Sequence, residues 1–287
     1  MLFKEFQEQL RNSKRIVALV GAGLSASSGL PTFRGSQGLW KNFNLIDLAT
    51  PDAFDIDPGL VWQFYSWRRS KSFEAQPNNG HRALAKLARS SDVDFLTISQ
   101  NVDGLLIRAG HPRNKLMEIH GTLADLKCTS LSCNYVSHNN FDQPLTPALA
   151  DTEDEFEGDK KDASLFFSPV KQIPRNELPV CPVCKNGSLL RPGVVWFGEM
   201  LPVQALNQIE DFFRKGPVDL ILVVGTSGTV YPANSYVNRV RNMGGKVAIF
   251  NTDIEEDIVD AEEGVWGFKG DAALLLPAAL NPLISEL

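Results

Sequence analysis

The 287-residue chain lacks long apolar runs and an excess of positive charge, and it holds only four cysteines. No apolar stretch approaches the ~20 residues needed to cross a bilayer, so we expect no membrane partner. The formal net charge of −6 argues against direct nucleic-acid binding, because contact with a phosphate backbone requires a basic face. The composition, 43% apolar and 22% charged, is that of an ordinary globular protein.

Targeting signals are also missing from the first fifteen residues, which are typical of an amphipathic helix and include Glu5 and Glu8. A secretory signal needs an uninterrupted apolar segment, and a mitochondrial presequence is poor in acidic residues. We therefore expect a soluble intracellular protein. The cytoplasm or nucleus is the favoured compartment, with the mitochondrion left open.

A glycine-rich turn follows the first predicted strand. The apolar residues 16–20 run directly into Gly21, Ala22, Gly23 and Ser25. A strand that ends in Gly-x-Gly-x-x-Ala and opens into a helix is typical of a dinucleotide phosphate site, where backbone amides and the helix dipole face the pyrophosphate. A dehydrogenase should also carry an acidic residue about twenty positions further on, at a strand tip, and no strand leads into Asp47. The turn therefore predicts a dinucleotide that is not used for hydride transfer.

Further apolar strands are predicted at residues 93–98, 218–224 and 246–250, and helices at 80–90 and 203–215. Continuous apolar strands alternating with helices indicate a parallel sheet covered on both faces. Each strand ends in polar or glycine-rich residues, which are either simple turns or the crevice at the carboxyl ends of the strands. The predicted fold class is α/β, a Rossmann-like doubly wound parallel sheet with a smaller inserted zinc-binding domain.

The four cysteines form two short-spaced pairs, Cys128 with Cys133 and Cys181 with Cys184. Such pairs suit a tetrahedral thiolate site for one structural zinc ion. Disulfides are the alternative, but they are disfavoured in an intracellular chain. A zinc ribbon can also be a nucleic-acid-binding module. Because this one lies in an acidic segment, we expect it instead to support the wall of a cleft. Residues 151–162 carry seven acids against two lysines, which predicts a solvated loop.

The predicted domain division has three parts. Segments 1–35, 80–126 and 192–287 form the Rossmann-like dinucleotide-binding domain. Residues 36–79 form a helical module, and residues 127–191 form the zinc-binding module with its acidic loop. His120 precedes Gly121 at the boundary of an element, where a neutral imidazole can face a cleft and accept a proton. We expect His81, His111 and His138 to be structural.

These motifs together resemble the sirtuins, NAD-dependent protein-lysine deacylases. The resemblance spans about residues 15–277 and rests on residues 21–25 and 29–34, the run from Gln100 to Asp103, His120 with Gly121, the two cysteine pairs, residues 191–199 and 225–227, and Asn251. It implies that His120 is the catalytic general base, that Asn101 is a second catalytic residue, and that NAD is a co-substrate. It also implies an acylated-lysine protein or peptide as partner, and nicotinamide and O-acyl-ADP-ribose as products.

The resemblance also assigns the binding residues. The NAD site comprises Gly21, Ala22, Gly23, Ser25, Phe33, Arg34, Gln100, Asn101, Val102, Asp103, Gly225, Thr226, Ser227, Asn251 and Ala272. The acyl-lysine channel comprises Val195, Trp196, Phe197, Gly198 and Glu199, whose backbone would pair with the extended substrate peptide. The bulkier residue expected at position 193 is replaced by Gly193, which would loosen selectivity.

Tyr65 and Arg68 lie three residues apart on a predicted helix and share a face. In class III sirtuins, a tyrosine and an arginine at this spacing recognise the carboxylate of succinyl, malonyl or glutaryl groups, and Thr32 fits the same branch. The resemblance thus favours a desuccinylase or demalonylase. The alternatives are a plain deacetylase, a mono-ADP-ribosyltransferase and a non-catalytic NAD-sensing module.

Overall fold

The computed structural model describes residues 2–32, 39–41, 43–150, 170–184, 186–226, 235–254 and 264–285. Phe33, Arg34, Ser227 and the predicted acidic loop at 151–162 lie outside the described residues. The chain divides into two compact units. Unit 1 contains residues 1–30, 75–120 and 201–287, and unit 2 contains residues 31–74 and 121–200.

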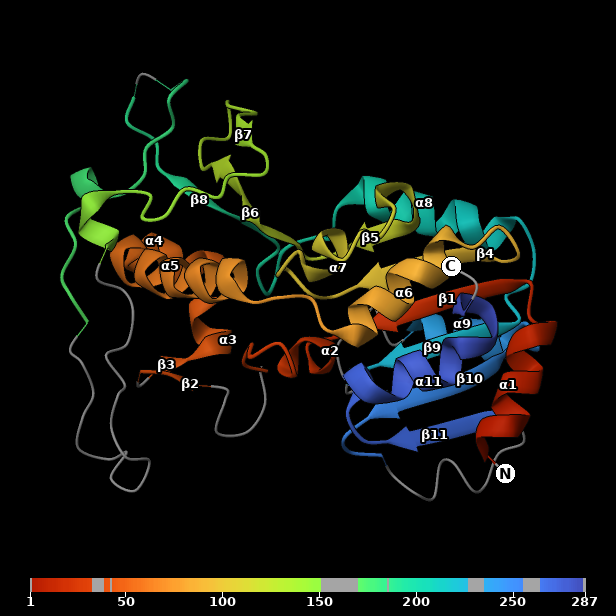
Figure 1. The fold of residues 1–287 in the computed structure, drawn as a ribbon. Coiled ribbons are helices and arrows are strands. Elements are labelled where there is room, and N and C mark those ends of the chain that lie inside the picture. The colour runs from red at the N-terminus through yellow and green to blue at the C-terminus, as the bar shows by residue number, and fades with distance from the viewer. Residues whose placement is uncertain are drawn as a thin grey trace, which may run out of the picture. The chain divides into compact units, whose positions relative to one another are not determined.

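Unit 1 is built on a six-stranded parallel sheet (Figure 1). Its strand order is β11 (Val265–Lys269), β10 (Lys246–Asn251), β9 (Leu220–Val224), β1 (Arg15–Val20), β4 (Asp94–Ser99) and β5 (Leu116–Glu118). The chain moves outward from β1 through β4 to β5, and then returns to the other side of β1 and continues to β11. This order is the doubly wound Rossmann arrangement, which confirms the predicted fold class. Its topological switch point lies between β1 and β9.

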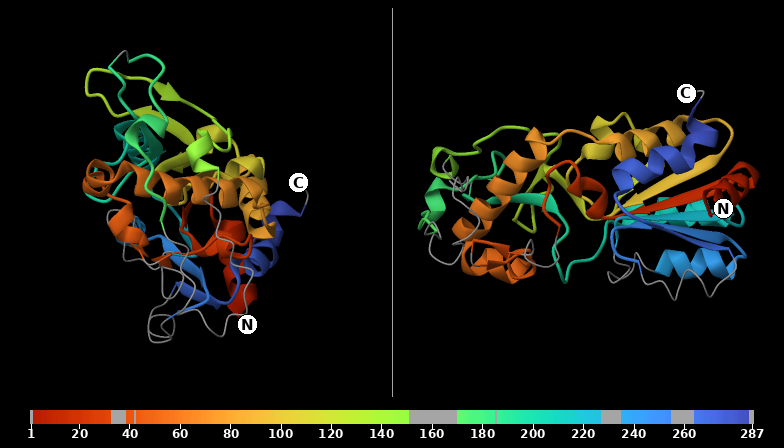
Figure 2. Two further views of the ribbon diagram at one scale, coloured as in Figure 1. Left: turned by 90° about the vertical axis from the view of Figure 1, so that its left-hand side faces the viewer. Right: turned by 60° about the horizontal axis from the view of Figure 1, so that its bottom comes forward.

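Helices cover both faces of this sheet, as Figures 1 and 2 show. Side chains of β1 alternate: Ile16, Ala18 and Val20 join one buried cluster, and Val17 and Leu19 join another. The first cluster includes residues of α1 (Leu2–Asn12), α6 (Asn79–Arg89) and α11 (Ala272–Ile284), and the second includes residues of α8 (Val203–Arg214) and α9 (Ser235–Asn242). Strand β1 is thus buried on both faces, as expected for a parallel sheet.

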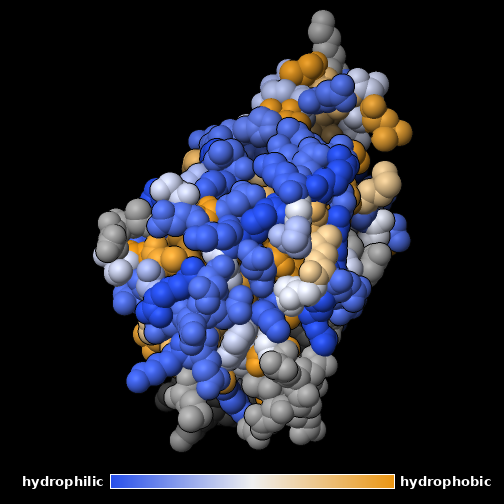
Figure 3. All heavy atoms as spheres, turned by 90° about the vertical axis from the view of Figure 1, so that its right-hand side faces the viewer, coloured by the Kyte–Doolittle hydropathy of each residue, from blue (hydrophilic) through white to orange (hydrophobic). Residues whose placement is uncertain are grey.

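Two short helices of unit 1 follow strand ends, α2 (Gly23–Ala26) after β1 and α7 (Leu105–Arg108) after β4. The 3₁₀ turn η2 (Arg113–Lys115) leads into β5. Within the described residues, no helix is both long and apolar enough to cross a membrane. The face drawn in Figure 3 is mostly hydrophilic with scattered hydrophobic side chains, as is usual for a surface in contact with water.

Unit 2 holds a three-stranded antiparallel sheet in the order β7 (Val136–Ser137), β6 (Gly121–Cys128) and β8 (Leu190–Val194). A smaller pair joins β2 (Leu39–Trp40) to β3 (Phe43–Asn44). The other elements of unit 2 are α3 (Leu45–Leu48), α4 (Pro51–Ile56), α5 (Pro58–Glu74), η3 (Pro147–Leu149) and η4 (Arg175–Glu177).

Two buried side chains attach α5 to the rest of unit 2. The Trp62 indole nitrogen donates to the carbonyl of Leu190 on β8 at 2.9 Å. Arg69 donates to the carbonyls of Leu123 on β6, Asn140 and Asp142. Both donors are buried, so losing either hydrogen bond would leave a polar group without a partner or water. These contacts therefore fix which face of α5 packs against the sheet of unit 2.

Candidate active site

The strand tips of unit 1 form two loops in direct backbone contact. The amide of Gly23 donates to the carbonyl of Gly225 at 2.8 Å, and the amide of Gly21 donates to the carbonyl of Val224 at 2.9 Å. A Cβ on Gly23 would lie 2.7 Å from the Cα of Gly225, closer than real Cβ contacts allow. The glycines are thus needed for the close approach of the two loops, in addition to the expected approach of a phosphate.

Polar side chains link the same loops. Asn101 donates to the Gly21 carbonyl at 3.0 Å and to the Ser25 hydroxyl at 3.3 Å. Gln100 donates to the Thr226 hydroxyl at 3.1 Å, and Asn251 donates to the Thr226 carbonyl at 3.1 Å. Unit 1 therefore brings together residues from the ends of β1, β4, β9 and β10.

The other predicted cofactor residues in unit 1 lie on the same loops or beside them. Ala22 is half-buried on the turn after β1, and Val102 is half-buried after β4. Ala272 is buried at the start of α11, next to α6. These placements are compatible with a dinucleotide site, and the roles of the individual residues stay predictions.

Asp103 is held by a short chain of hydrogen bonds. The His81 Nδ1 accepts from the Asn78 amide at 3.2 Å, in a capping box at the start of α6, so the proton of the neutral ring lies on Nε2. This Nε2 is 3.3 Å from the Ser25 hydroxyl, which donates to Asp103 Oδ2 at 2.6 Å. Burial lowers the pKa of His81 to about 4, so the ring is neutral at physiological pH.

His120 has a defined tautomer. Its Nδ1 lies 2.9 Å from the Gln100 carbonyl oxygen, which can only accept, so the ring proton resides on Nδ1. Burial lowers the pKa of His120, and the hydrogen bond to Gln100 opposes the shift more weakly. The Nε2 of His120 therefore carries a lone pair over the physiological pH range, which is the form that a general base needs.

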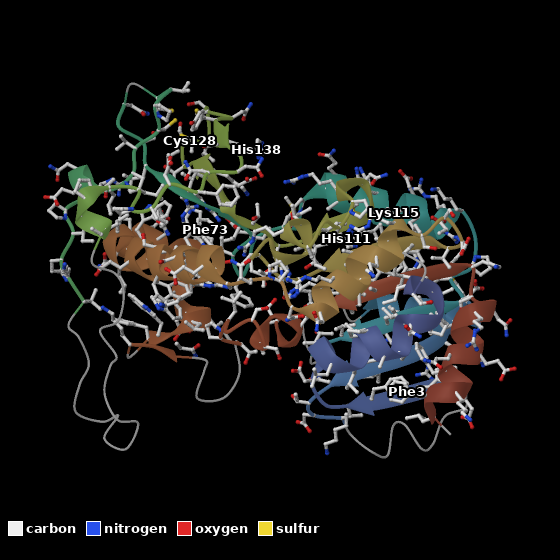
Figure 4. All side chains as sticks on the ribbon, viewed as in Figure 1. Phe3, Phe73, His111, Lys115, Cys128 and His138 are labelled. Carbon is white, nitrogen blue, oxygen red and sulfur yellow. The ribbon has the colours of Figure 1, made fainter. Side chains whose placement is uncertain are left out.

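The four cysteines of unit 2 converge as predicted. All four Sγ atoms lie within 4.8 Å of one another, with Cys128 to Cys184 at 3.5 Å and Cys133 to Cys181 at 3.9 Å. Four thiolates around zinc at ~2.3 Å stand roughly 3.8 Å apart, whereas disulfide sulfurs are ~2.05 Å apart. The spacing therefore fits one structural zinc ion and excludes disulfides. Figure 4 shows Cys128 at the end of β6.

Tyr65 and Arg68 lie one turn apart on α5. Tyr65 is 1% exposed and Arg68 is half-buried, with its guanidinium carbon 5.5 Å from the Phe64 ring centroid and 5.7 Å from that of Tyr65. Burial raises the pKa of Tyr65, and the charge and hydrogen bonding of Arg68 oppose this shift more weakly. The Tyr65 hydroxyl therefore stays protonated and lies close to a cation.

The predicted channel segment 195–199 has contacts of its own within unit 2. The Phe197 amide donates to the Ala49 carbonyl at 2.9 Å, and the Trp196 amide donates to Glu199 Oε2 at 2.8 Å. Val195 is half-buried, and Phe197 and Gly198 are exposed. Some amides of this segment are thus already paired, and pairing of the remaining backbone with a peptide stays a prediction.

Two residues near the predicted sites were not predicted as functional. Arg191 pairs with Glu199 and lies over the Trp196 ring, and His81 contacts Ser25. The spacing of Asn78 and His81 signals a capping box, but nothing in the sequence signals the contact with Ser25. The structural roles expected for His111 and His138 stay predictions. His111, labelled in Figure 4, is buried against Thr97, and His138 pairs with Asp125. Gly193 is buried, and a Cβ there would lie 2.4 Å from the Cβ of Asp125, so the pairing of β6 with β8 requires glycine.

Comparison with known proteins identifies the family. A model of the Sir2 family matches residues 21–232. An NAD-dependent protein deacylase of Candida albicans is 63% identical over 303 residues, covering 99% of this chain and 98% of that protein. The mitochondrial NAD-dependent protein deacylase sirtuin-5 of Canis lupus familiaris is 40% identical over 281 residues, covering 97% of this chain and 84% of that protein.

Solved structures agree. A Sir2 homologue in complex with NAD has a TM-score of 0.77 and 35% identity, covering 99% of this chain and 94% of that one. A Sir2 structure with a p53 peptide and NAD⁺ has a TM-score of 0.73 and 27% identity, covering 98% of each chain. These matches confirm the predicted family, NAD as co-substrate and the predicted α/β fold, and the cluster of four cysteines is consistent with one structural zinc ion. The chain belongs to the Sir2 family, close to the sirtuin-5 type, and is an NAD-dependent protein deacylase.

Proposed function

We propose that this enzyme removes acidic acyl groups, succinyl and malonyl and also glutaryl, from protein lysines. Its products would be the free lysine, nicotinamide and O-acyl-ADP-ribose. The observation that carries the proposal is the pairing of Tyr65 with Arg68 on α5, where a protonated hydroxyl and a half-buried guanidinium lie together. An acyl chain that ends in a carboxylate would find a hydrogen-bond donor and a cation, whereas an acetyl group has no charge to offer them.

The expected preference follows from the strength of charged hydrogen bonds. A hydrogen bond to a charged group contributes about 1.5–3 kcal/mol, which corresponds to a preference of about ten- to a hundredfold. The relationship to the dog sirtuin-5 supports the same branch. A plain deacetylase is the second candidate, because an acetyl group differs from a succinyl group only in lacking the terminal carboxylate and its adjoining methylene.

His120 would act as the general base. When bound, NAD would supply the ribose carbon, which exchanges its bond to the leaving nicotinamide for a bond to the acyl oxygen, and the ribose hydroxyls that complete the transfer. The His120 Nε2 lone pair, fixed by the Nδ1 contact with Gln100, would accept the proton of a ribose hydroxyl. Asn101 would hold the nicotinamide ribose, and Asp103 would accept from the carboxamide. Ser25 donates to Asp103 and keeps the carboxylate oriented.

The test is NAD-dependent nicotinamide release from matched succinyl-lysine and acetyl-lysine peptides. We expect wild type to prefer the succinyl peptide at least tenfold in kcat/KM and Arg68→Met to lose that preference. Lys71→Met is the matched control, since Lys71 is a half-buried cation on the same helix that pairs with Glu74. Equal use of the two peptides by wild type, unchanged in Arg68→Met, would contradict the proposal in favour of a plain deacetylase.

A further inference from the structure

Arg191 begins a series of contacts within unit 2 that ends at the Tyr65 hydroxyl. Its two terminal nitrogens donate to Glu199 Oε1 at 2.5 Å and Oε2 at 2.9 Å. Its guanidinium carbon lies 3.4 Å from the centroid of the Trp196 ring, a stacked cation–π contact. Glu199 Oε2 also accepts from the Trp196 amide. The ring and the backbone of Trp196 are therefore both held by the Arg191–Glu199 pair.

Trp196 contacts Tyr65 directly. The indole Nε1 donates to the Tyr65 hydroxyl oxygen at 2.9 Å, and the two side chains are 3% and 1% exposed. An indole N–H can only donate, and the guanidinium of Arg68 also can only donate. The Tyr65 oxygen thus accepts from the indole and also lies within hydrogen-bonding reach of the Arg68 guanidinium, a second donor, so its own hydrogen must be directed to an acceptor elsewhere.

We infer that Trp196 is a positioning residue that holds the Tyr65 hydroxyl as a hydrogen-bond donor for the carboxylate of the acyl group, with Arg191 and Glu199 keeping Trp196 in place. This inference rests on the proposed preference for acidic acyl groups. An ionised carboxylate is an acceptor only, so it complements a hydroxyl whose hydrogen is directed outward. Burial raises the pKa of Tyr65, and the hydroxyl therefore keeps this hydrogen throughout the physiological pH range.

Removing the indole N–H should therefore act through Tyr65. In Trp196→Phe an aromatic ring remains to pack against Phe54, whose centroid is 5.3 Å away, and against Arg191. The Tyr65 hydroxyl, however, would lose the donor that fixes its orientation and could turn its hydrogen away from the substrate. A neutral hydrogen bond contributes about 0.5–1.5 kcal/mol, so the expected loss of discrimination is about two- to tenfold.

The experiment is a double-mutant cycle over Trp196→Phe and Tyr65→Phe, with kcat and KM measured separately for matched succinyl and acetyl peptides. Trp196→Phe should lower the succinyl-to-acetyl ratio of kcat/KM by about two- to tenfold, through a higher KM for the succinyl peptide. The double variant should have the same ratio as Tyr65→Phe alone, because the indole acts through the hydroxyl. Arg191→Lys, which keeps the charge but not the flat stacking, should shift the ratio in the same direction by less.

The outcomes separate the two proposals. Arg68→Met could abolish the succinyl preference while Trp196→Phe and Arg191→Lys lower kcat/KM equally for the succinyl and acetyl peptides. In that case the positioning role is wrong and the acyl preference stands. An additive effect in the double variant would overturn the positioning role as well. If wild type shows no succinyl preference, both proposals fail.

Discussion

The Nδ1 of His120 lies 2.9 Å from the carbonyl oxygen of Gln100, the residue that follows β4. This contact places the ring proton on Nδ1 and leaves Nε2 as the basic nitrogen. It also opposes, only in part, the lowering of the His120 pKa by burial. Together these features leave the His120 ring neutral, with a lone pair on Nε2.

The first prediction concerns the pH dependence of deacylation. A lowered pKa means that His120 stays neutral as the pH falls below the usual histidine range, so activity should persist there. The acid limb of kcat/KM should have an apparent pKa below ~6.5. His120→Gln should reduce kcat by about a hundredfold or more, which nicotinamide release would measure. An acid limb of kcat/KM with an apparent pKa at or above the ordinary histidine value would contradict the lowering of the His120 pKa by burial.

A second prediction links His111 to acid stability. Burial lowers the pKa of His111 to about 4 in the folded protein, whereas the unfolded chain titrates near ~6.5. Between these values the unfolded state binds a proton that the folded state does not. The free energy of unfolding should therefore fall as the pH is lowered from about 6.5 to 4, by up to about 1.4 kcal/mol per pH unit from this group.

Urea unfolding at several pH values would measure this dependence. His111→Gln keeps a donor for the Pro112 carbonyl and an acceptor for Thr97 without a titrating ring. The slope with pH in this window should be smaller in the variant than in wild type. Identical slopes would show that His111 does not titrate as described.

The third prediction concerns zinc. Purified wild type should contain one zinc ion per chain by elemental analysis, bound at the four cysteines. Cys184→Ser should lose most of this zinc and unfold at a lower temperature, because metal binding and folding of such sites are coupled. Full zinc content in Cys184→Ser, or none in wild type, would argue against the site.

Gly121 supports a fourth prediction. It has a φ of +74°, and a Cβ there would lie 2.2 Å from the carbonyl oxygen of Gly193. Gly198 has a φ of +89° in the same unit, with no atom within 4 Å of its Cβ position. Gly198→Ala should cost about 1–2 kcal/mol for the left-handed backbone alone. Gly121→Ala should cost about 2–5 kcal/mol, because the clash adds to the strain. Equal costs in urea unfolding would show that the close contact is unimportant.

Much of the sheet could be predicted because its central strands are continuous apolar runs. The predicted strands at 16–20, 93–98, 218–224 and 246–250 agree with β1, β4, β9 and β10 to within two residues. The predicted helices at 80–90 and 203–215 agree equally well with α6 and α8. Strands β5 and β11 were not predicted. The first has only three residues, and the second mixes Gly267 and Lys269 with its apolar positions, so neither gives a clear periodic signal.

In the candidate site, features set by local spacing could be predicted, whereas contacts between residues far apart in the sequence could not. The cysteine ligands could be predicted because each pair is short-spaced, and this spacing reflects the local turn that brings two ligands to one metal ion. Tyr65 and Arg68 could be grouped because helical periodicity places them on one face. The contact of Trp196 with Tyr65 joins residues 131 positions apart, and no local pattern encodes it. The tautomer of His120 likewise depends on Gln100, twenty residues earlier, and needs three-dimensional structure.

The proposed preference requires the enzyme to recognise the charge at the end of the acyl group. The most direct measurement compares kcat/KM for a succinyl-lysine peptide with that for the same peptide carrying 4-oxopentanoyl-lysine, which has nearly the same shape but a neutral end. Wild type should prefer the succinyl peptide by about tenfold or more, and Arg68→Met should treat the two alike. Equal rates for the two peptides in wild type would contradict recognition of the carboxylate.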